Sequence, residues 1–206
     1  MFVDYDGTIT GVDTFDLLVR TFAGDDAWHG FERDLRAGRI TLREALEREA
    51  ALVRLSRTEA LAFLERHAPV DPTFAPFVRR AHAHGASVSV VSSGLRQIIG
   101  PALERASVDV PVFANDVVFD ADGWKLTFLD DSANGHDKAA RVRDARDAGL
   151  QTVYIGDGIS DFDAALAADV RFAKAGRALE RYCRDQGVAM TPFATFAEID
   201  VVPAER

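Results

Sequence analysis

The sequence predicts an α/β protein, in which a parallel sheet carries helices on both faces and a small helical segment is inserted after the first strand. The chain opens with a short apolar strand, Phe2-Val3. Residues 14–67 then show helical periodicity with few strand signals. From Asp71 onward, buried-strand patterns alternate with helical patterns over short links, which is typical of parallel strands joined by crossover helices.

Composition and charge indicate a globular protein that does not bind polyanions. The chain has 206 residues, 48% hydrophobic and 28% charged, enough for one domain or for a core with a small insert. Its net charge of −9 argues against nucleic acid or an anionic membrane as a partner. The single Cys183 cannot form an internal disulfide, and neither a signal peptide nor a membrane-length apolar run is found. We therefore expect a cytoplasmic protein, and the sequence leaves open whether it is a monomer or a homodimer.

Four short amphipathic helices are expected in the inserted segment. The apolar periodicity of the first two stops at Gly24 and Gly38. Thr41 is placed to cap the third helix, and Ser56 with Glu59 forms a capping box ahead of the fourth. We interpret the aromatic residues of this segment as its own core rather than as substrate contacts.

The remainder of the chain is expected to form the sheet and its covering helices. Residues 86–91 predict a buried strand, with Ser92-Ser93-Gly94 as its exit turn. Asp122-Gly123, between strands at 117–119 and 125–128, is the strongest hairpin signal. Further strands are expected at 112–113, 152–155, 170–173 and 188–190, and helices through 74–81, through 98–103, over 137–148, up to Leu166 and around Leu179.

Two acids spaced by one residue, Asp4 and Asp6, end the first strand. Residues two apart in a strand share a face, so both carboxylates can reach one small space. Such a pair suits phosphoryl transfer, in which one carboxylate attacks phosphorus and the other moves protons. Gly7 permits the tight turn that follows. The alternative is a solvated turn; a calcium loop does not fit, because further oxygen ligands at regular spacing are absent.

Polar residues follow other predicted strands as well. Because ligands bind at the carboxyl ends of parallel strands, Asp4, Ser92 and Asp157 are expected to meet there. The backbone amides and hydroxyl of Ser92, Ser93 and Gly94 could hold phosphate oxygens at a helix start. Plain helix capping by serine is the structural alternative.

A magnesium site is expected among the same carboxylates. Mg²⁺ prefers oxygen ligands, and Asp4 with Asp157 is the natural pair, with the backbone carbonyl of Asp6 as a third ligand. Asp161 binds the metal through water or orients Asp157, or else it is only a first-turn residue favoured by the helix dipole. The sequence leaves these alternatives open.

Lysine is rare, and one lysine is well placed. Lys138 lies near the start of the helix before the Asp157 strand, where it can neutralise the nucleophile and a transferring phosphoryl group. Lys174 follows a strand and is a weaker rival, and Lys125 on the hairpin is expected to be solvated. His136 is assigned to a surface turn.

Together these residues resemble the haloacid dehalogenase superfamily of phosphatases. The four motifs of that family occur in order as Asp4-Tyr5-Asp6-Gly7-Thr8, Ser92, Lys138 and Gly156-Asp157-Gly158-Ile159-Ser160-Asp161. The resemblance spans nearly the whole chain. It implies a Rossmann-like core of residues 1–12 and 72–206, with residues 13–71 as a helical cap like that of the phosphoserine phosphatase branch.

The resemblance also implies roles for individual residues. Asp4 is implied as nucleophile, Asp6 as general acid and base, and Ser92 and Lys138 as contacts of the phosphoryl group. The implied Mg²⁺ site is formed at Asp4, Asp6, Asp157 and Asp161, and Thr8, Ser93 and Gly94 are expected around the phosphate. Asp13 is a candidate for contacting the substrate beyond its phosphate.

Some details lean away from phosphoserine phosphatase itself. Phosphoserine phosphatases have a serine and a glutamate at the positions where this sequence has Gly7 and Asp13. Ser160 replaces the asparagine that is usual in the last motif. The tail, residues 169–196, looks like the methionine-salvage type of phosphatase. We therefore expect a Mg²⁺-dependent phosphomonoesterase acting on a small phosphorylated metabolite. The alternatives are phosphoserine phosphatase, a phosphomutase, and a non-catalytic protein that binds a phosphorylated metabolite.

Overall fold

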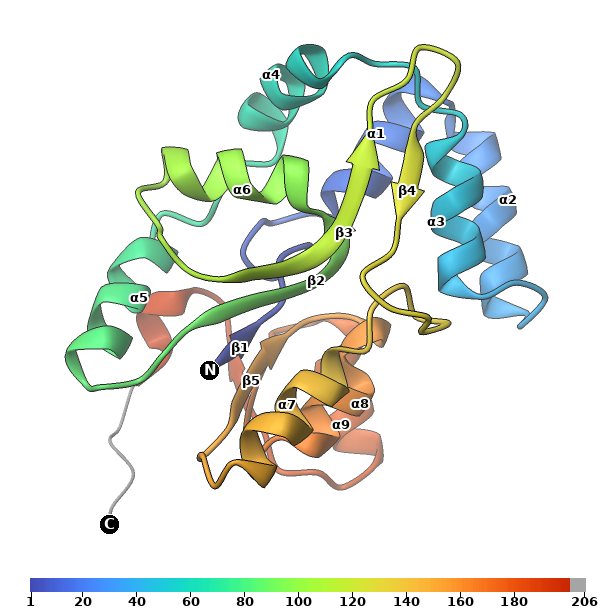
Figure 1. The fold of residues 1–206 in the computed structure, drawn as a ribbon. Helices are drawn as coiled ribbons and strands as arrows, with labels where there is room; N and C mark the ends of the chain where they lie inside the picture. Colours follow the sequence, from blue (N-terminus) through green and yellow to red (C-terminus); the bar gives the residue numbers. More distant parts are fainter. Residues whose placement is uncertain (201–206) are drawn as a thin grey trace.

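A seven-stranded sheet forms the centre of the protein in a computed structural model that describes residues 1–200 (Figure 1). The strand order is β4-β3-β2-β1-β5-β6-β7, and every neighbouring pair is parallel except β3–β4. This confirms the predicted α/β fold. The strands are β1 (Phe2–Val3), β2 (Ser89–Leu95), β3 (Val112–Val118), β4 (Lys125–Thr127), β5 (Val153–Gly156), β6 (Val170–Lys174) and β7 (Thr191–Phe193).

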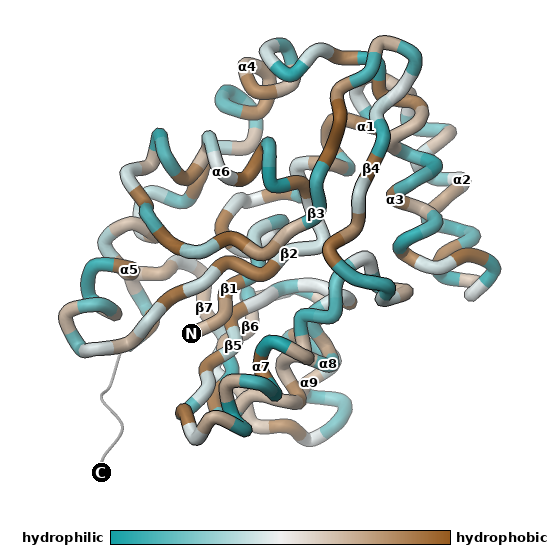
Figure 2. Tube along the Cα trace, viewed as in Figure 1, coloured by the Kyte–Doolittle hydropathy of each residue, from teal (hydrophilic) through white to brown (hydrophobic). Residues whose placement is uncertain are grey.

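Helices cover both faces of the sheet. On one face, α5 (Phe74–Ala83) and α6 (Arg96–Arg105) pack against β1 and β2 around Phe77 and Ile99. On the other face, α7 (Lys138–Asp147), α8 (Phe162–Ala167) and α9 (Ala178–Asp185) pack around Tyr154. The central strands are accordingly hydrophobic along much of their length (Figure 2). Burial on both faces explains why these strands appear in the sequence as apolar runs without alternation.

The inserted segment forms the four helices that its periodicity predicted, α1 (Thr14–Phe22), α2 (Asp25–Arg36), α3 (Leu42–Ala50) and α4 (Arg57–His67). The capping box at Ser56 is present, and Thr41 forms one as well. The chain leaves and re-enters the core at neighbouring points, where Thr10 bridges Val70 and the amide of Asp71 donates to the Ile9 carbonyl at 2.8 Å. Within residues 1–200, no helix is both long and apolar enough to cross a membrane.

The β3–β4 hairpin packs on the inserted helices, an arrangement that the sequence did not reveal. Trp124 is 2% exposed, its ring stacks 6.4 Å from that of Phe15 in α1, and its indole N–H donates to the Leu55 carbonyl at 2.7 Å. A side chain at Gly123 would collide with the backbone of Ala51. The core around these helices therefore includes residues outside 13–71.

Three strand boundaries differ from the prediction. β2 does not end in a turn at Ser92; it continues to Leu95, because a register shift after Val91 lets it keep pairing with β3. β3 is one strand from 112 to 118 rather than two short ones. The last strand lies at 191–193 rather than 188–190: Phe193 is 1% exposed and anchors it, and this edge strand tolerates Pro192.

Candidate active site

The sheet brings the predicted strand ends together. Val3 of β1 pairs with Val90 on one side and with Ile155 on the other, and the amide of Asp4 donates to the Ile155 carbonyl at 2.9 Å. Asp4 therefore continues β1 between β2, which carries Ser92, and the end of β5, which Asp157 follows. Asp4 is 4% exposed, so its carboxylate sits in a site largely closed to bulk water.

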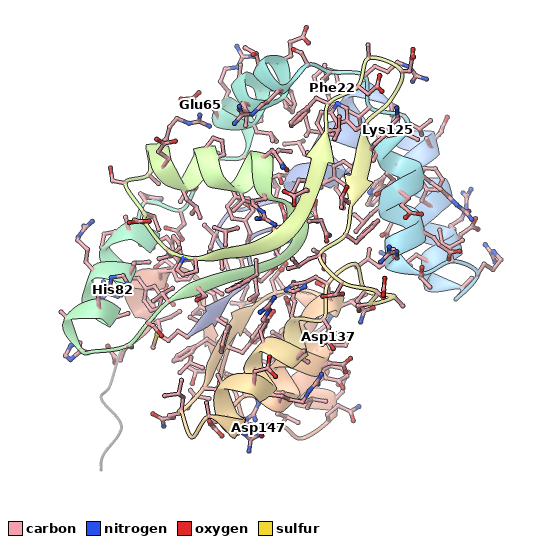
Figure 3. All side chains as sticks on the ribbon, viewed as in Figure 1. Phe22, Glu65, His82, Lys125, Asp137 and Asp147 are labelled. Atoms are coloured by element: carbon pink, nitrogen blue, oxygen red, sulfur yellow. The ribbon has the colours of Figure 1, made fainter. Side chains whose placement is uncertain are left out.

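Lys138 is the cation of this site. It is the first residue of α7, next to the N-cap residue Asp137 (Figure 3). Its Nζ atom lies 2.7 Å from Asp4 Oδ1, 2.7 Å from Asp161 Oδ1 and 3.0 Å from Ser160 Oγ. Burial alone would lower the pKa of Lys138, but the charges of Asp161 and Asp4 outweigh it and raise the pKa above its usual value. The ammonium group thus stays charged.

Asp161 is held by hydrogen bonds on both of its oxygens. Besides Lys138, its Oδ1 accepts from the Tyr154 hydroxyl at 2.6 Å. Its Oδ2 accepts from the backbone amides of Asp157 and Gly158, each at 2.9 Å. The side chain is fully buried. This carboxylate therefore fixes both the lysine and the loop that carries Asp157.

The site has more carboxylates than cations. Oxygen atoms of Asp4, Asp157 and Asp161 lie within 4.8 Å of one another, with Lys138 as the contacting cation. Burial, followed by the Asp161 charge, raises the pKa of Asp157 to about 7 and that of Asp4 well above its usual value. The Thr8 hydroxyl lies between them, 3.4 Å from Asp4 Oδ2 and 3.3 Å from Asp157 Oδ1. This surplus of oxygen ligands fits a hard divalent cation such as Mg²⁺.

Asp6 is tied to the start of the inserted helices. Its Oδ1 accepts from the backbone amide of Thr14 at 2.8 Å and from the Thr14 hydroxyl at 2.6 Å. Burial and, next, the Asp13 charge raise the pKa of Asp6 to about 7. Gly94 leaves room for this carboxylate, because a β-carbon there would lie 2.5 Å from Asp6 Oδ2. The acid is thus poised to exchange a proton near neutral pH.

Gly7 is needed for a different reason, the conformation and close packing of the backbone. Its φ of +77° lies in the left-handed region, and a β-carbon at this position would collide with the Asp157 carboxylate. Only glycine meets both conditions, since it has no β-carbon and adopts this φ at little cost. The close approach of the two motifs therefore depends on this residue.

Three predicted residues have their side chains engaged in local hydrogen bonds. The Ser92 hydroxyl accepts from the Gly94 amide at 2.9 Å, and the Ser93 hydroxyl donates to the Asn134 carbonyl at 2.9 Å. The Asp13 carboxylate caps α1, accepting from the amides of Phe15 at 2.9 Å and Asp16 at 2.8 Å. Ser92 and Gly94 lie beside Asp6, whereas the Ser93 hydroxyl is directed at the loop before α7.

The other lysine candidates and His136 lie in different parts of the structure. Lys125 pairs with Asp120 and its side chain is 70% exposed, which confirms that it is solvated (Figure 3). Lys174 donates to the Thr8 carbonyl at 3.2 Å, close to the site but outside the carboxylate group. The prediction of a surface turn for His136 was wrong. It is 2% exposed, because the loop before α7 folds inward and Asp130 Oδ2 contacts its Nδ1 at 2.8 Å.

Sequence reasoning missed three residues that hold the site together. Ser160 contacts Lys138, and its place inside the last motif was a usable signal. Thr14 binds Asp6 from the start of a helix, where a threonine is easily taken for a simple cap. Tyr154 contacts Asp161 from within an apolar strand, where the pattern gives no sign of a polar role.

Comparison with known proteins identifies the family. Residues 1–166 match the model of the haloacid dehalogenase-like hydrolase family, and the chain belongs to that family. It is 33% identical to Pdp3-interacting factor 1 of Schizosaccharomyces pombe, over 97% of this chain and 92% of that relative. It is also 33% identical to the polyol phosphate phosphatase PYP1 of Saccharomyces cerevisiae (97% and 90%) and 27% identical to a 2-hydroxy-3-keto-5-methylthiopentenyl-1-phosphate phosphatase of Exiguobacterium sibiricum (95% and 92%).

Solved structures share the fold. A substrate-bound phosphoserine phosphatase complex superposes with a TM-score of 0.72 at 16% identity, covering 96% of this chain and 94% of the other. A phosphoserine phosphatase from T. onnurineus gives 0.69 at 20% identity, covering 96% and 90%. The chain is an enzyme, a phosphatase of the haloacid dehalogenase-like family, as its motifs predicted.

Proposed function

We propose that the protein is a Mg²⁺-dependent phosphomonoesterase that works through an aspartyl-phosphate on Asp4. The contact of Asp4 with Lys138, beside Asp157, is the observation that carries this proposal. The Asp4 carboxylate attacks phosphorus, an acyl phosphate forms, and the phosphorus–oxygen bond to the leaving alcohol breaks. Asp6 gives its proton to the leaving oxygen and then takes one from the water that hydrolyses the intermediate. A pKa near 7 suits both steps.

The metal and its neighbours have separate parts in this proposal. Asp4, Asp157 and the backbone carbonyl of Asp6 would hold Mg²⁺, which neutralises negative charge on the phosphoryl oxygens when bound. Lys138 stays protonated and attracts the same oxygens. We assign Asp161 an orienting role, because its oxygens already accept from Lys138, Tyr154 and two backbone amides.

The substrate is proposed to be a small phosphorylated metabolite under a helical cap of residues 13–71, with residues 1–12 and 72–206 as the core. The names of the relatives suggest two substrate classes, a polyol phosphate and the methionine-salvage phosphate. Phosphoserine remains the alternative from the sequence. A cytoplasmic location and a monomeric or homodimeric state also remain predictions.

The first test is Asp4→Asn. We expect turnover of p-nitrophenyl phosphate to fall by roughly a thousandfold or more, because the nucleophile is lost. The protein should still fold, as judged by circular dichroism. Asp147→Asn is the matched control, since Asp147 is exposed at the opposite end of α7 from Asp137 (Figure 3) and should keep full activity. Unchanged hydrolysis by Asp4→Asn would remove Asp4 as the nucleophile.

Metal dependence and the reaction class are tested on the same preparation. EDTA should abolish turnover and added Mg²⁺ should restore it; full activity without metal would contradict the proposed site. Release of inorganic phosphate in equal amount to the alcohol supports hydrolysis. An isomerised phosphate ester would instead indicate a phosphomutase, and binding without turnover would indicate a non-catalytic protein.

A further inference from the structure

One buried carboxylate among the inserted helices has no hydrogen-bond partner. Glu49 is 5% exposed, and no donor within residues 1–200 contacts its oxygens. It lies on the buried face of α3, between Leu46 and Ala50, which pack against Phe15 and Leu18 of α1. The Glu49 oxygens are not among the side-chain atoms that are both sealed from solvent and without a partner, so a ligand can still reach them. Holding a carboxyl group this deep with so little solvent contact costs free energy. Its persistence points to a partner that is not part of the fold.

The charged groups that act on Glu49 are acidic. Its side chain feels the charges of Asp16 and Asp13 on the side of α1 and of Glu32 from α2. The arginines nearby are engaged elsewhere. Arg20 pairs with Asp25 at 2.6 Å, and Arg43 donates to the Asp130 carbonyl at 2.7 Å. An anionic group placed here would add negative charge to a group of acids whose pKa values are already raised by burial and by their mutual charges.

The inserted helices also contain a buried hydrogen-bond donor without a partner. The Trp28 indole N–H, carried by α2, is buried and has no hydrogen-bond partner among the described residues. It is close enough to Asp16 to oppose the rise in pKa that burial causes in that carboxyl, although no hydrogen bond of ordinary geometry joins the two. An unmatched donor and an unmatched acceptor therefore occur on neighbouring helices, α2 and α3.

The helix that carries Asp16 starts next to the reaction site. Thr14, which binds Asp6 through both its amide and its hydroxyl, is two residues before Asp16 in α1. Two residues rise only about 3 Å along a helix. The charge of Asp6 also acts directly on Asp16. A phosphate ester bound at Asp4 whose carbon chain passes Asp6 would run toward the start of α1, where Asp16 lies.

We infer that Glu49, Asp16 and the Trp28 indole form a subsite for hydroxyl groups of the substrate, so that the substrate is the phosphate monoester of a neutral polyol. A hydroxyl group both donates and accepts, so it satisfies a carboxylate and an indole N–H together. An ammonium group only donates and leaves the indole unmatched. A carboxylate only accepts and meets the acids, and a methylthio group satisfies neither. This inference rests on the proposed phosphatase reaction at Asp4.

The first experiment compares substrates. The enzyme with Mg²⁺ is assayed on erythritol 4-phosphate and sorbitol 6-phosphate, on phosphoserine and phosphoethanolamine, and on p-nitrophenyl phosphate. We expect kcat/KM for the better polyol phosphate to exceed that for phosphoserine and for phosphoethanolamine by roughly tenfold or more. A preference for either amine, or for an apolar ester over both polyols, would overturn the inference.

The second experiment separates binding from structure. In Glu49→Leu, kcat/KM for the polyol relative to p-nitrophenyl phosphate should fall roughly tenfold to a hundredfold. Glu49→Gln, which still donates and accepts, should recover part of that ratio. The melting temperature of Glu49→Leu should rise, because an apolar side chain replaces a buried group without a partner. A merely structural role predicts the reverse, with stability lost and the substrate ratio unchanged.

Glu47→Gln is the matched control, because Glu47 is exposed on the same helix and should change neither the ratio nor the melting temperature. Failure of this inference is distinguishable from failure of the proposed function. If Asp4→Asn abolishes p-nitrophenyl phosphate turnover while polyols are not preferred, the phosphatase proposal stands and the subsite does not.

Discussion

Two groups of carboxylates in this protein are held in opposite ways. The core carboxylates, Asp4, Asp157 and Asp161, share a lysine, a tyrosine hydroxyl, a threonine hydroxyl and backbone amides. The cap carboxylates, Asp16 and Glu49, have one neighbouring indole, and Asp16 also feels the charge of Arg20; the other charged groups that act on them are acids. The core groups, to which we assign the reaction, are held by fixed hydrogen bonds, as electrostatic catalysis requires. Groups with unmet hydrogen-bonding capacity are suited to recognise a ligand.

The largest expected effect comes from removing the core cation. Lys138→Met leaves the two buried carboxylates of Asp4 and Asp161 without their ammonium partner, and breaking a buried pair in this way costs about 3–5 kcal/mol. The melting temperature measured in EDTA should fall by roughly 10 °C. Activity with Mg²⁺ should fall by roughly a thousandfold. Lys125→Met, at an exposed pair, is the control and should alter neither. A stable, active Lys138→Met would show that the core carboxylates do not depend on this lysine.

A smaller loss of activity is expected from substitution of Gly7, which lets the first motif approach Asp157 of the last motif. Gly7→Ala places a β-carbon against the Asp157 carboxylate, and a displacement of about 1 Å there is worth roughly a hundredfold in kcat. Gly149→Ala is the matched control, because Gly149 has nearly the same φ, +78°, and no atom near its missing β-carbon. Both variants should lose about 1 kcal/mol of stability from backbone strain. Equal activities in the two variants would rule out the contact with Asp157 as the cause.

The smallest effect concerns the cap, and it appears as a pH dependence of stability. Burial, followed by the Asp16 charge, raises the pKa of Glu49 from its usual 4.5 to about 9. A carboxyl whose pKa is higher in the folded state contributes stability that is fully present below its unfolded pKa and is lost as the pH rises through the folded pKa. Urea unfolding should therefore show Glu49 losing this contribution between about pH 4.5 and pH 9. Glu49→Leu should flatten that slope, and a slope identical to that of the native chain would contradict the assigned burial of Glu49.

Local features of the structure were predictable from the sequence, and long-range contacts were not. The helix starts at Thr41 and Ser56 follow from residues within one turn, and the order of elements follows from periodicity. Asp4 and Asp157 could be paired because parallel strand ends meet at one edge of a sheet. The partners of Trp124 and His136 come from tertiary packing, which no local pattern encodes.

The same limit applies inside the site. Lys138 was found because lysine is rare and the helix start points at the strand ends. Tyr154 was missed because its hydroxyl becomes relevant only when the loop after β5 folds back and brings Asp161 next to it. No sequence pattern marks Glu49 among the acids of the inserted helices, and only its burial distinguishes it.

The central claim, covalent transfer of phosphate to Asp4, is tested most directly by acid-quenching the enzyme during turnover of a phosphorus-labelled ester with Mg²⁺. Peptide mass spectrometry should then locate an acid-stable, alkali-labile phosphate on Asp4, and Asp4→Asn should carry none. Label on another residue, or in Asp4→Asn, would contradict the account.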